Sequence, residues 1–390
     1  MSARTIAAAS VLASVACIGL ADSAATGTVR AAAVPAPLYL SPSGSDRGSC
    51  RRATPCRSFR RAYEVARPGQ TVIVGGGRYA DQEEIDREQK PSSRDVIFRP
   101  AKGARPVLGA LDVEGSHVEF RGLRIENDFY LQCSADDVTL RGSKARLFFI
   151  RSSRNIRLIG TEFGPSDSIS QIGHNEECRR APRGILMDRV YMHDYTNDDP
   201  SAHMECLTIQ AADDMVIRRS RFHHCEDFDI LIKHRAPVVD TSNLLIENTW
   251  FDEPWPDGST AIQFSQPASG GTFRNVVIRN NSFAGTLLLK PGIRYEDVRV
   301  VGNAGVAYGG ACGDGVAASH NVWRRGGCGG TDLRADPRFR NRGAFDFHLA
   351  AGSPAIGRGH PSDYPRVDID GQRRPVGRRA DAGADEFRRR

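Results

Sequence analysis

An eight-residue phrase that recurs along the chain constrains the fold more than any other feature. Clear copies read MVIRRSRF at 215–222, LLIENTWF at 244–251 and VVIRNNSF at 276–283. In each copy apolar residues alternate with other residues, a bend of small or polar residues follows, and an aromatic residue closes the phrase. Such alternation is typical of strands. Because a repeated strand–bend–strand unit has to bury its apolar face on its neighbours, the pattern predicts a solenoid, namely a parallel β-helix.

A second family of short apolar segments alternates with this phrase and also has strand periodicity. Further copies of the phrase, some degraded, occupy 118–125, 138–145, 156–163, 185–192 and 298–305. The second family occupies 130–134, 146–152, 168–173, 205–210, 228–233, 260–265 and 286–290. Two strand families that alternate this regularly predict an all-β solenoid across residues 95–330.

The two ends of the chain differ from the repeat. Residues 1–33 carry Arg4, an alanine-rich apolar run and then small residues, which is typical of a secretory signal peptide followed by a linker. Residues 331–390 are rich in Arg, Pro and Asp and predict an irregular tail. Residues 34–94 predict an N-terminal cap with a short helix, because one helical face gathers Phe59, Ala62, Tyr63 and Ala66.

Charge and cysteine usage narrow the class of protein. The 53 basic and 47 acidic residues are mixed along the repeats and leave a net charge of only +6, so no nucleic-acid footprint stands out. No segment after the leader is long and apolar enough to span a membrane. Without Cys17 an even set of eight cysteines remains, which favours disulfides in a secreted chain. The expected pairs are Cys50–Cys56, Cys312–Cys328, Cys206–Cys225 and, by elimination, Cys133–Cys178.

Both ends of the chain resemble known proteins. LYLSPSGSD at 38–46 and ARPGQTVIVGGGRY at 66–79 resemble the opening of secreted bacterial right-handed β-helix proteins of the pectate-lyase-like superfamily. Segments similar to the ending of many such proteins are DPRF at 336–339, GSPAIGRG at 352–359, DIDGQRRP at 368–375 and DAGADEF at 381–387. The resemblance implies a right-handed parallel β-helix. It leaves the activity open, because this superfamily includes lyases, hydrolases, epimerases and members without known chemistry.

Aligning the second strand family on its apolar pairs predicts which side chains point outward in rows. The alignment uses Leu207/Ile209, Ile230/Ile232, Ile262/Phe264 and Leu287/Leu289. One outward row then holds Gln210, Lys233, Ser265 and Lys290. The other two rows hold Thr208, Leu231, Gln263 and Leu288, and Cys206, Asp229, Ala261 and Thr286. A polar insertion at 193–206 is expected at the rim of this face.

The ionisable residues on this face suggest a site for an acidic polysaccharide. A uronate lyase needs a base and a positive group that stabilises the enolate-like charge, often calcium or an arginine. In the resembling lyases the base is commonly a Lys or Arg on the outer face of the coils. The candidate catalytic residues are Lys233 as base, Arg235 as the group that neutralises the uronate, and Asp229 and Glu205 as groups that orient the sugar or bind calcium. Asp227 and Asp229 are the candidate calcium ligands, and the candidate substrate-binding residues are His203, His224, Lys290 and Trp255.

Two further readings of the same residues stay open. A glycoside hydrolase needs two carboxylates at a defined separation, which Glu205 with Asp227 or Asp229 would supply. A non-catalytic extracellular protein would bind glycans, or serve a structural role, without chemistry. In each case the expected molecule is a secreted monomer that engages a polysaccharide.

Overall fold

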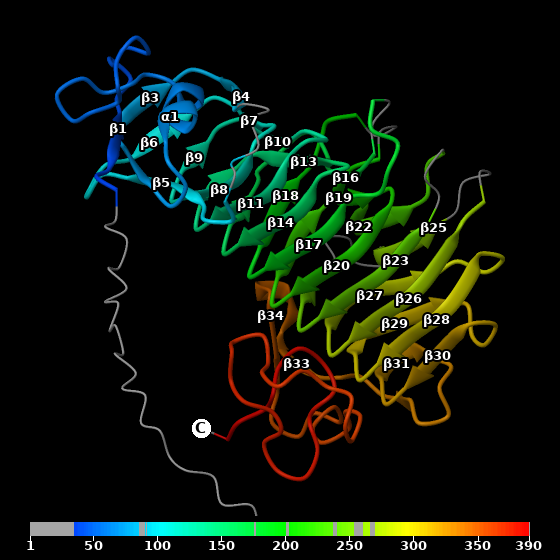
Figure 1. Cartoon of the computed structure of the whole chain (residues 1–390). Coiled ribbons are helices and arrows are strands. Elements are labelled where there is room, and N and C mark those ends of the chain that lie inside the picture. Colours follow the sequence, from blue (N-terminus) through cyan, green and yellow to red (C-terminus); the bar gives the residue numbers. More distant parts are fainter. Residues whose placement is uncertain are drawn as a thin grey trace, which may run out of the picture. The chain divides into compact units, whose positions relative to one another are not determined.

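The chain folds as a stack of β-coils whose strands pair in parallel with the coils before and after them (Figure 1). The computed structural model describes residues 35–85, 90, 92–174, 177–199, 203–236, 240–252, 260–265 and 270–389. The repeat therefore produces the parallel β-helix that the sequence predicts. No described helix is both long and apolar enough to cross a membrane.

The first half of each phrase forms a 12-stranded parallel sheet. Its apolar alternation buries one face, as in Met215, Leu244 and Val276, which follow one another in register. The strands are β1 (Leu38–Leu40), β2 (Thr71–Val74), β5 (Val96–Pro100), β8 (Ser116–Arg121), β11 (Asp136–Arg141), β14 (Arg154–Ile159), β17 (Arg183–Asp188), β20 (Ala212–Arg218), β23 (Thr241–Glu247), β26 (Thr272–Arg279), β28 (Arg294–Val301) and β30 (Val316–Ser319).

The 20-stranded sheet contains two rows of strands that meet at a corner. Row A, formed by the second half of the phrase, contains β3 (Gly77–Tyr79), β6 (Pro106–Leu108), β9 (Arg124–Ile125), β12 (Lys144–Ala145), β15 (Glu162–Phe163), β18 (Tyr191–Tyr195), β21 (Arg221–Cys225), β24 (Trp250–Phe251), β31 (Val322–Gly326) and β32 (Leu333–Arg334). Row B, the second strand family, contains β4 (Gln82–Ile85), β7 (Leu111–Val113), β10 (Asp128–Leu131), β13 (Leu147–Arg151), β16 (Ser170–Gly173), β19 (Glu205–Ile209), β22 (Phe228–Lys233) and β25 (Thr260–Ser265). The longer strands β27 (Ser282–Leu289) and β29 (Ala304–Gly310) continue past the corner, and β27 pairs with both β24 and β25.

The bend inside the phrase is made by one residue per coil with a left-handed backbone. Glycine and asparagine adopt this conformation at the lowest cost, which explains the RG, IG and RN pairs in the phrase. The positions, with φ between 49° and 62°, are Gly122, Gly142, Gly160, Arg189, Arg219, Asn248, Asn280, Gly302 and His320.

Directly after the bend, buried asparagines form a hydrogen-bonded ladder along the last coils. The backbone amide of Asn281 donates to Oδ1 of Asn303 at 3.0 Å, and that of Asn303 donates to Oδ1 of Asn321 at 2.9 Å. The ladder satisfies backbone groups that water cannot reach.

Replacing Asn303 by alanine is expected to lower the free energy of unfolding by about 2–3 kcal/mol. The substitution leaves the buried amide of Asn281 and the buried carbonyl of Ile278 without their partner. Urea denaturation measures the change. Asn127→Ala is the matched control, because Asn127 is exposed and its side chain has no hydrogen bond among the described residues; an equal loss in both variants would contradict a role for the ladder.

The N-terminal cap contains the expected helix, α1 (Phe59–Val65). Ser58 caps it by accepting a hydrogen bond from the Arg61 amide at 3.1 Å. Phe59 is buried and stacks on Phe98 of β5 with ring centroids 5.0 Å apart. The helix therefore covers the apolar interior of the first coils, which a solenoid requires at its end.

All four expected disulfides are present: Cys50–Cys56, Cys133–Cys178, Cys206–Cys225 and Cys312–Cys328. Cys206 lies on β19 and Cys225 ends β21, so this bond ties row B to row A across the corner.

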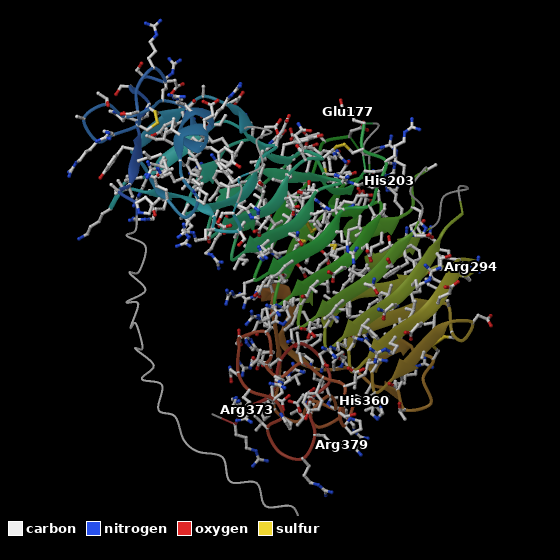
Figure 2. All side chains as sticks on the ribbon, viewed as in Figure 1. Glu177, His203, Arg294, His360, Arg373 and Arg379 are labelled. Atoms are coloured by element: carbon white, nitrogen blue, oxygen red, sulfur yellow. A yellow bond between two sulfur atoms is a disulfide. The ribbon has the colours of Figure 1, made fainter. Side chains whose placement is uncertain are left out.

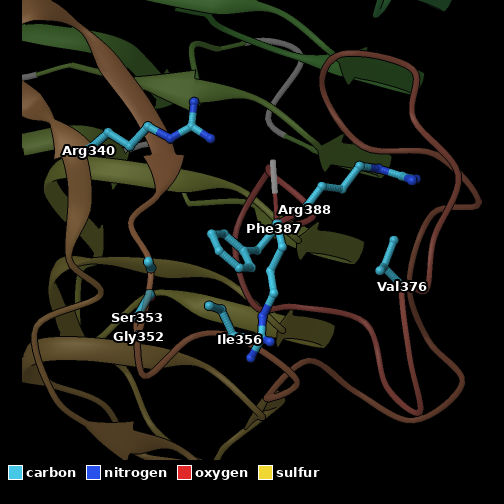
Figure 3. Close-up of a pocket in the computed structure, with 9 residues that line it drawn as sticks. Arg340, Gly352, Ser353, Ile356, Val376, Phe387 and Arg388 are labelled. Atoms are coloured by element: carbon cyan, nitrogen blue, oxygen red, sulfur yellow. The ribbon is translucent and has the colours of Figure 1, made fainter.

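The tail folds back onto row A and the first sheet and is more ordered than its composition suggests. It contains an antiparallel pair, β33 (Phe339–Asn341) and β34 (Asp346–Leu349), and one 3-10 turn, η1 (Arg342–Ala344). Phe347 packs on Trp250 of β24 at 5.7 Å between ring centroids. Arginines extend from the tail, among them Arg373 and Arg379 in Figure 2, and the tail also lines a pocket (Figure 3).

The tail should lose stability as pH rises from about 6.5 to 9. Hydrogen bonds from His348 to Asp370 and Asp346 outweigh the effect of burial and raise the pKa of this imidazole to about 9. The negative charge of Asp385 also favours the protonated form of His348. The Trp250 ring packs edge-on against the imidazole of His348. The folded tail holds this proton more tightly than the unfolded chain, so the stabilisation is complete below about pH 6.5 and lost as pH passes 9.

Urea denaturation of the tail, followed by Trp250 fluorescence, at pH 6 and pH 9 measures this loss, which we expect to be on the order of 2 kcal/mol. The variant His348→Gln removes this titration and should show a smaller difference between the two pH values. Burial also raises the pKa of Asp381, to about 7, and adds a contribution of the same sign that this variant retains. An unchanged pH dependence in the variant would contradict the assignment.

Candidate functional site

The outward rows of row B follow the alignment made from the sequence. Leu231 pairs with Thr208 on one side and with Gln263 on the other, and Lys233 pairs with Ser265. Lys290 continues this last row, because the preceding pair joins Phe264 to Leu289. One position differs from the alignment: a register shift pairs Thr286 with Thr260 instead of Ala261.

Lys233 stands at the end of β22 with a half-buried side chain that makes no hydrogen bond or ion pair with any described residue. Burial raises the pKa of Glu205 on the neighbouring strand, and the charge of Lys233 opposes this rise. The two groups are therefore close enough for their charges to interact. Oε2 of Glu205 is buried and has no hydrogen-bond partner in the described part of the chain.

The carboxylates of this site are much less exposed than an outward row suggests. Glu205 is 1% exposed and Asp229 is 2% exposed. Glu205 also differs in direction, because it pairs with Phe228 and so has the inward parity of Leu207. Glu205 starts β19 whereas Lys233 ends β22, five residues beyond the partner of Glu205, so the two groups lie toward opposite ends of the paired strands.

Segments at the ends of the strands cover part of this face. Nε2 of His174, just after β16, lies 3.0 Å from the carbonyl of Ala236, just after β22. This contact passes over the end of β19, where Gln210 is only 5% exposed. Gly173 leaves room for the Gln210 side chain, since a Cβ at this glycine would lie only 2.9 Å from it. The face is therefore a sheltered surface.

The other candidate residues have different surroundings. Arg235 and Lys290 are exposed, and Trp255 lies outside the described residues. His203 has a 74% exposed side chain whose Nδ1 lies 3.8 Å from Asp227. Oδ2 of Asp227 accepts the backbone amide of Met204 at 2.7 Å, so this carboxylate helps to hold the turn before β19.

The calcium ligands proposed from the sequence do not form a ligand set in the described residues. Clusters with three ligand atoms close together occur at Asp95, His117 and Asp137 and at His348, Asp370 and Asp385, but not around Asp227 and Asp229. Calcium prefers six to eight oxygen ligands. We therefore assign no chemical step to calcium.

Sequence reasoning missed an aromatic strip on the same outward face. Tyr130 on β10 pairs with Phe149 on β13, and their ring centroids are 5.3 Å apart. The guanidinium of Arg151 lies over both rings, at 4.9 Å from Phe149 and 5.9 Å from Tyr130. Arg151 occupies the row of Lys233, three strands away, or about 14 Å. The alternation FFIR contains this signal, because Phe148 points inward and Phe149 outward.

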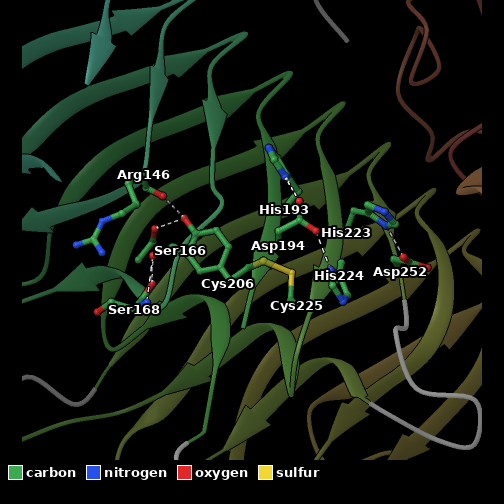
Figure 4. The surroundings of a disulfide bond; sticks show 12 residues. Arg146, Ser166, Ser168, His193, Asp194, Cys206, His223, His224, Cys225 and Asp252 are labelled. Atoms are coloured by element: carbon green, nitrogen blue, oxygen red, sulfur yellow. Dashed lines mark hydrogen bonds and ion pairs between the residues drawn. A yellow bond between two sulfur atoms is a disulfide. The ribbon is translucent and has the colours of Figure 1, made fainter. Parts of the chain in front are cut away.

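His224 belongs to a separate network on row A (Figure 4). Its Nδ1 lies 2.7 Å from Asp194, whose other oxygen lies 2.7 Å from Nδ1 of His193. Nε2 of His193 lies 3.1 Å from Glu162, which also binds Lys144. Burial opposes ionisation of Asp194, but its bonds to the two histidines lower the pKa overall. The network spans four coils, and its parts lie far apart in the sequence.

His223 is held in the same region by the tail and by the residue that follows β24. Its Nδ1 lies 2.5 Å from Asp252, and this hydrogen bond raises the pKa of the imidazole above its usual value. Its ring stacks on Phe345 at 4.4 Å. His223 and His224 lie on β21 in row A, whereas Lys233 ends β22 in row B. The histidines and the lysine therefore belong to different faces of the solenoid.

Solved structures of known proteins share this architecture. The complex of XylC with xylose aligns with a TM-score of 0.51 at 10% identity, covering 90% of this chain and 98% of that chain. Pectate lyase Pel9A aligns with a TM-score of 0.44 at 13% identity, covering 90% and 97%. PfbA, a surface adhesin of Streptococcus pneumoniae, aligns with a TM-score of 0.33 at 10% identity, covering 67% and 82%.

No protein-family model and no curated protein matches the sequence. At these identities the structural likeness shows the fold alone. The long parallel sheets and the likeness to XylC agree with the architecture that both ends of the sequence resemble. The chain is therefore a parallel β-helix protein.

Proposed function

We propose that this protein is a secreted carbohydrate-active enzyme that cleaves an acidic polysaccharide by β-elimination on the outward face of row B. The observation that carries the proposal is Lys233. It stands in an outward row, makes no ion pair with a described residue and interacts by charge with the buried Glu205. A partly buried lysine without a carboxylate partner is a candidate for proton transfer.

The proposed reaction uses Lys233 as the base. Its neutral amine removes the proton from the carbon next to the uronate carboxylate. The electrons of that C–H bond form a C=C bond, the glycosidic C–O bond breaks, and the departing oxygen takes up a proton. Arg235, exposed two residues later, would stabilise the negative charge that develops on the carboxylate. Glu205 and Asp229 are almost fully buried, so we assign neither of them a contact with the sugar.

The aromatic strip supports a polymeric substrate. Tyr130 and Phe149 offer apolar ring surface to the C–H faces of sugar units, and Arg151 offers a guanidinium to a carboxylate. Lys290 lies on the other side of Lys233, two strands or about 10 Å away. XylC, which has the same fold, is seen with xylose, so a sugar ligand is compatible with this architecture.

The test is an ultraviolet assay of the mature protein with polygalacturonate, alginate and other uronate polymers. β-Elimination creates a C=C bond conjugated to the uronate carboxylate, so ultraviolet absorbance should rise with time. Parallel reactions with calcium and with a chelator test the metal prediction. No absorbance rise on any polymer, with reducing-sugar release also absent, would contradict the proposal.

A non-catalytic glycan-binding protein is the second candidate. The observation that favours it is the aromatic strip, which can hold a sugar chain without any chemistry at Lys233. A polymer that binds without being cleaved would establish this function. The glycoside hydrolase reading has less support, because Asp227 is engaged with the Met204 amide.

A further inference from the structure

The tail contains a pocket of about 1520 Å³ that is separate from the Lys233 row. Figure 3 shows Phe387 between Arg340 on one side and Val376 on the other. Val376 is 42% exposed, and it is the one large apolar side chain that stays exposed in the described part of the chain. The full lining is Arg340, Ala351, Gly352, Ser353, Ile356, Val376, Phe387, Arg388 and Arg389.

Three guanidinium groups surround this apolar floor, and none has a carboxylate partner among the described residues. Arg388 donates only to the backbone carbonyl of Arg373, at 3.0 Å. Arg340 contributes to lowering the pKa of Asp370, but the ion pairs of Asp370 are with His348 and Arg221. Arg389 makes no hydrogen bond or ion pair with a described residue.

Some arginines elsewhere in the molecule share an acid. Arg279 and Arg299 share Asp363, with distances of 2.6 and 2.5 Å, and Arg121 and Arg141 share Glu119 in the same way. Guanidinium groups that lie near one another without an acid between them repel, and this repulsion costs free energy. An anionic ligand bound among them would relieve the repulsion. What distinguishes the pocket is that three such arginines line one apolar hollow.

The pocket walls are held by buried hydrogen bonds. The amide of Phe387 donates to Oδ2 of Asp381 at 2.7 Å, and the amide of Val376 donates to Oε1 of Glu386 at 2.6 Å. Both acids are almost fully buried. Floor residues fixed in this way keep the pocket formed without a ligand, which lowers the entropy that binding has to offset.

We propose that this tail pocket binds an acidic sugar unit, as a second and non-catalytic site for the acidic polysaccharide of the proposed function. The guanidinium forks of Arg340 and Arg388 pair with the carboxylate, since this geometry suits bidentate binding. The sugar ring covers Phe387 and Val376 and removes apolar surface from water. The identity of the polymer rests on the proposed function; the acidic ligand class rests on the pocket alone.

The test measures binding of size-defined oligogalacturonate by isothermal titration to the full mature chain carrying Lys233→Ala, which prevents cleavage. Arg388→Ala combined with Arg389→Ala should lower the affinity of one binding event about 10- to 100-fold. The matched control, Arg378→Ala with Arg379→Ala, removes the same charge from exposed tail positions outside the pocket and should change the affinity less than about threefold. A neutral oligosaccharide of equal length should not bind at this site.

Equal losses in the pocket pair and the control pair would overturn the proposal, because they would indicate only diffuse attraction to a basic tail. Unchanged binding in the pocket pair would overturn it as well. A misfolded pocket variant is recognised by the circular dichroism of the tail aromatic residues; in that case Arg340→Gln, on the opposite wall, gives the same comparison. Failure of the proposed function is distinguishable, because it removes the ultraviolet signal of the unsubstituted protein and leaves tail binding intact.

Discussion

Replacing Lys233 by alanine is expected to lower the rate of β-elimination about 100- to 10,000-fold, the usual contribution of a positioned acid or base. The amine is the group that takes the proton, and Lys290, the other lysine of the row, lies two strands away. Initial rates of ultraviolet absorbance at saturating polymer measure the change. Substrate affinity should change far less, because Arg151 and Lys290 contact other sugar units of the chain in this proposal.

Lys102→Ala is the matched control for this variant. Lys102 is exposed on an early turn, outside row B, so its loss removes one positive charge but no candidate group. We expect its rate to stay within about twofold of the unsubstituted protein. A Lys233→Ala enzyme with the rate of the control would assign the base elsewhere, and an equal fall in both variants would point to net charge alone.

Replacing Arg374 by alanine is expected to destabilise the tail by about 3–5 kcal/mol, because buried acids then lose their compensating charge. The Arg374 side chain is fully buried, and Nη2 donates to the Gly383 carbonyl at 2.9 Å. Burial lowers the pKa of this guanidinium, and surrounding carboxylates oppose that effect. They are Asp368, Asp381, Asp385 and Glu386, and burial raises the pKa of each of them.

Urea denaturation followed by Trp250 fluorescence should report this loss, since the Trp250 ring packs on Phe347 and His348 of the tail. The loss should be smaller at pH 5 than at pH 8, because Asp381, with a pKa raised to about 7, is protonated at the lower pH. Arg373→Ala is the control, since Arg373 is the exposed neighbour in the same GQRRP segment. Similar losses at both positions would show that the buried charge is not the cause.

The sequence determined the coil architecture and the inward side of each strand. Alternating pairs such as Ile230/Ile232 are local, and a shift of one residue would expose every one of them, so the register of row B follows from the pattern. The bend positions can also be predicted from the sequence, because only a few residue types accept a left-handed backbone. The cysteine pairs can be predicted as well, because few cysteines lie on adjacent coils.

What covers each face was decided by the tertiary structure alone. The burial of Asp229, the approach of His174 to Ala236 and the shift at Thr286 depend on connecting segments of irregular length, which carry no period. The network from Lys144 to His224 joins residues 80 positions apart in the sequence, and the tail meets Asn248 across 119 positions. Periodicity fixes which side of a strand is buried, but only the packed chain decides which distant groups share an environment and which charges remain unpaired.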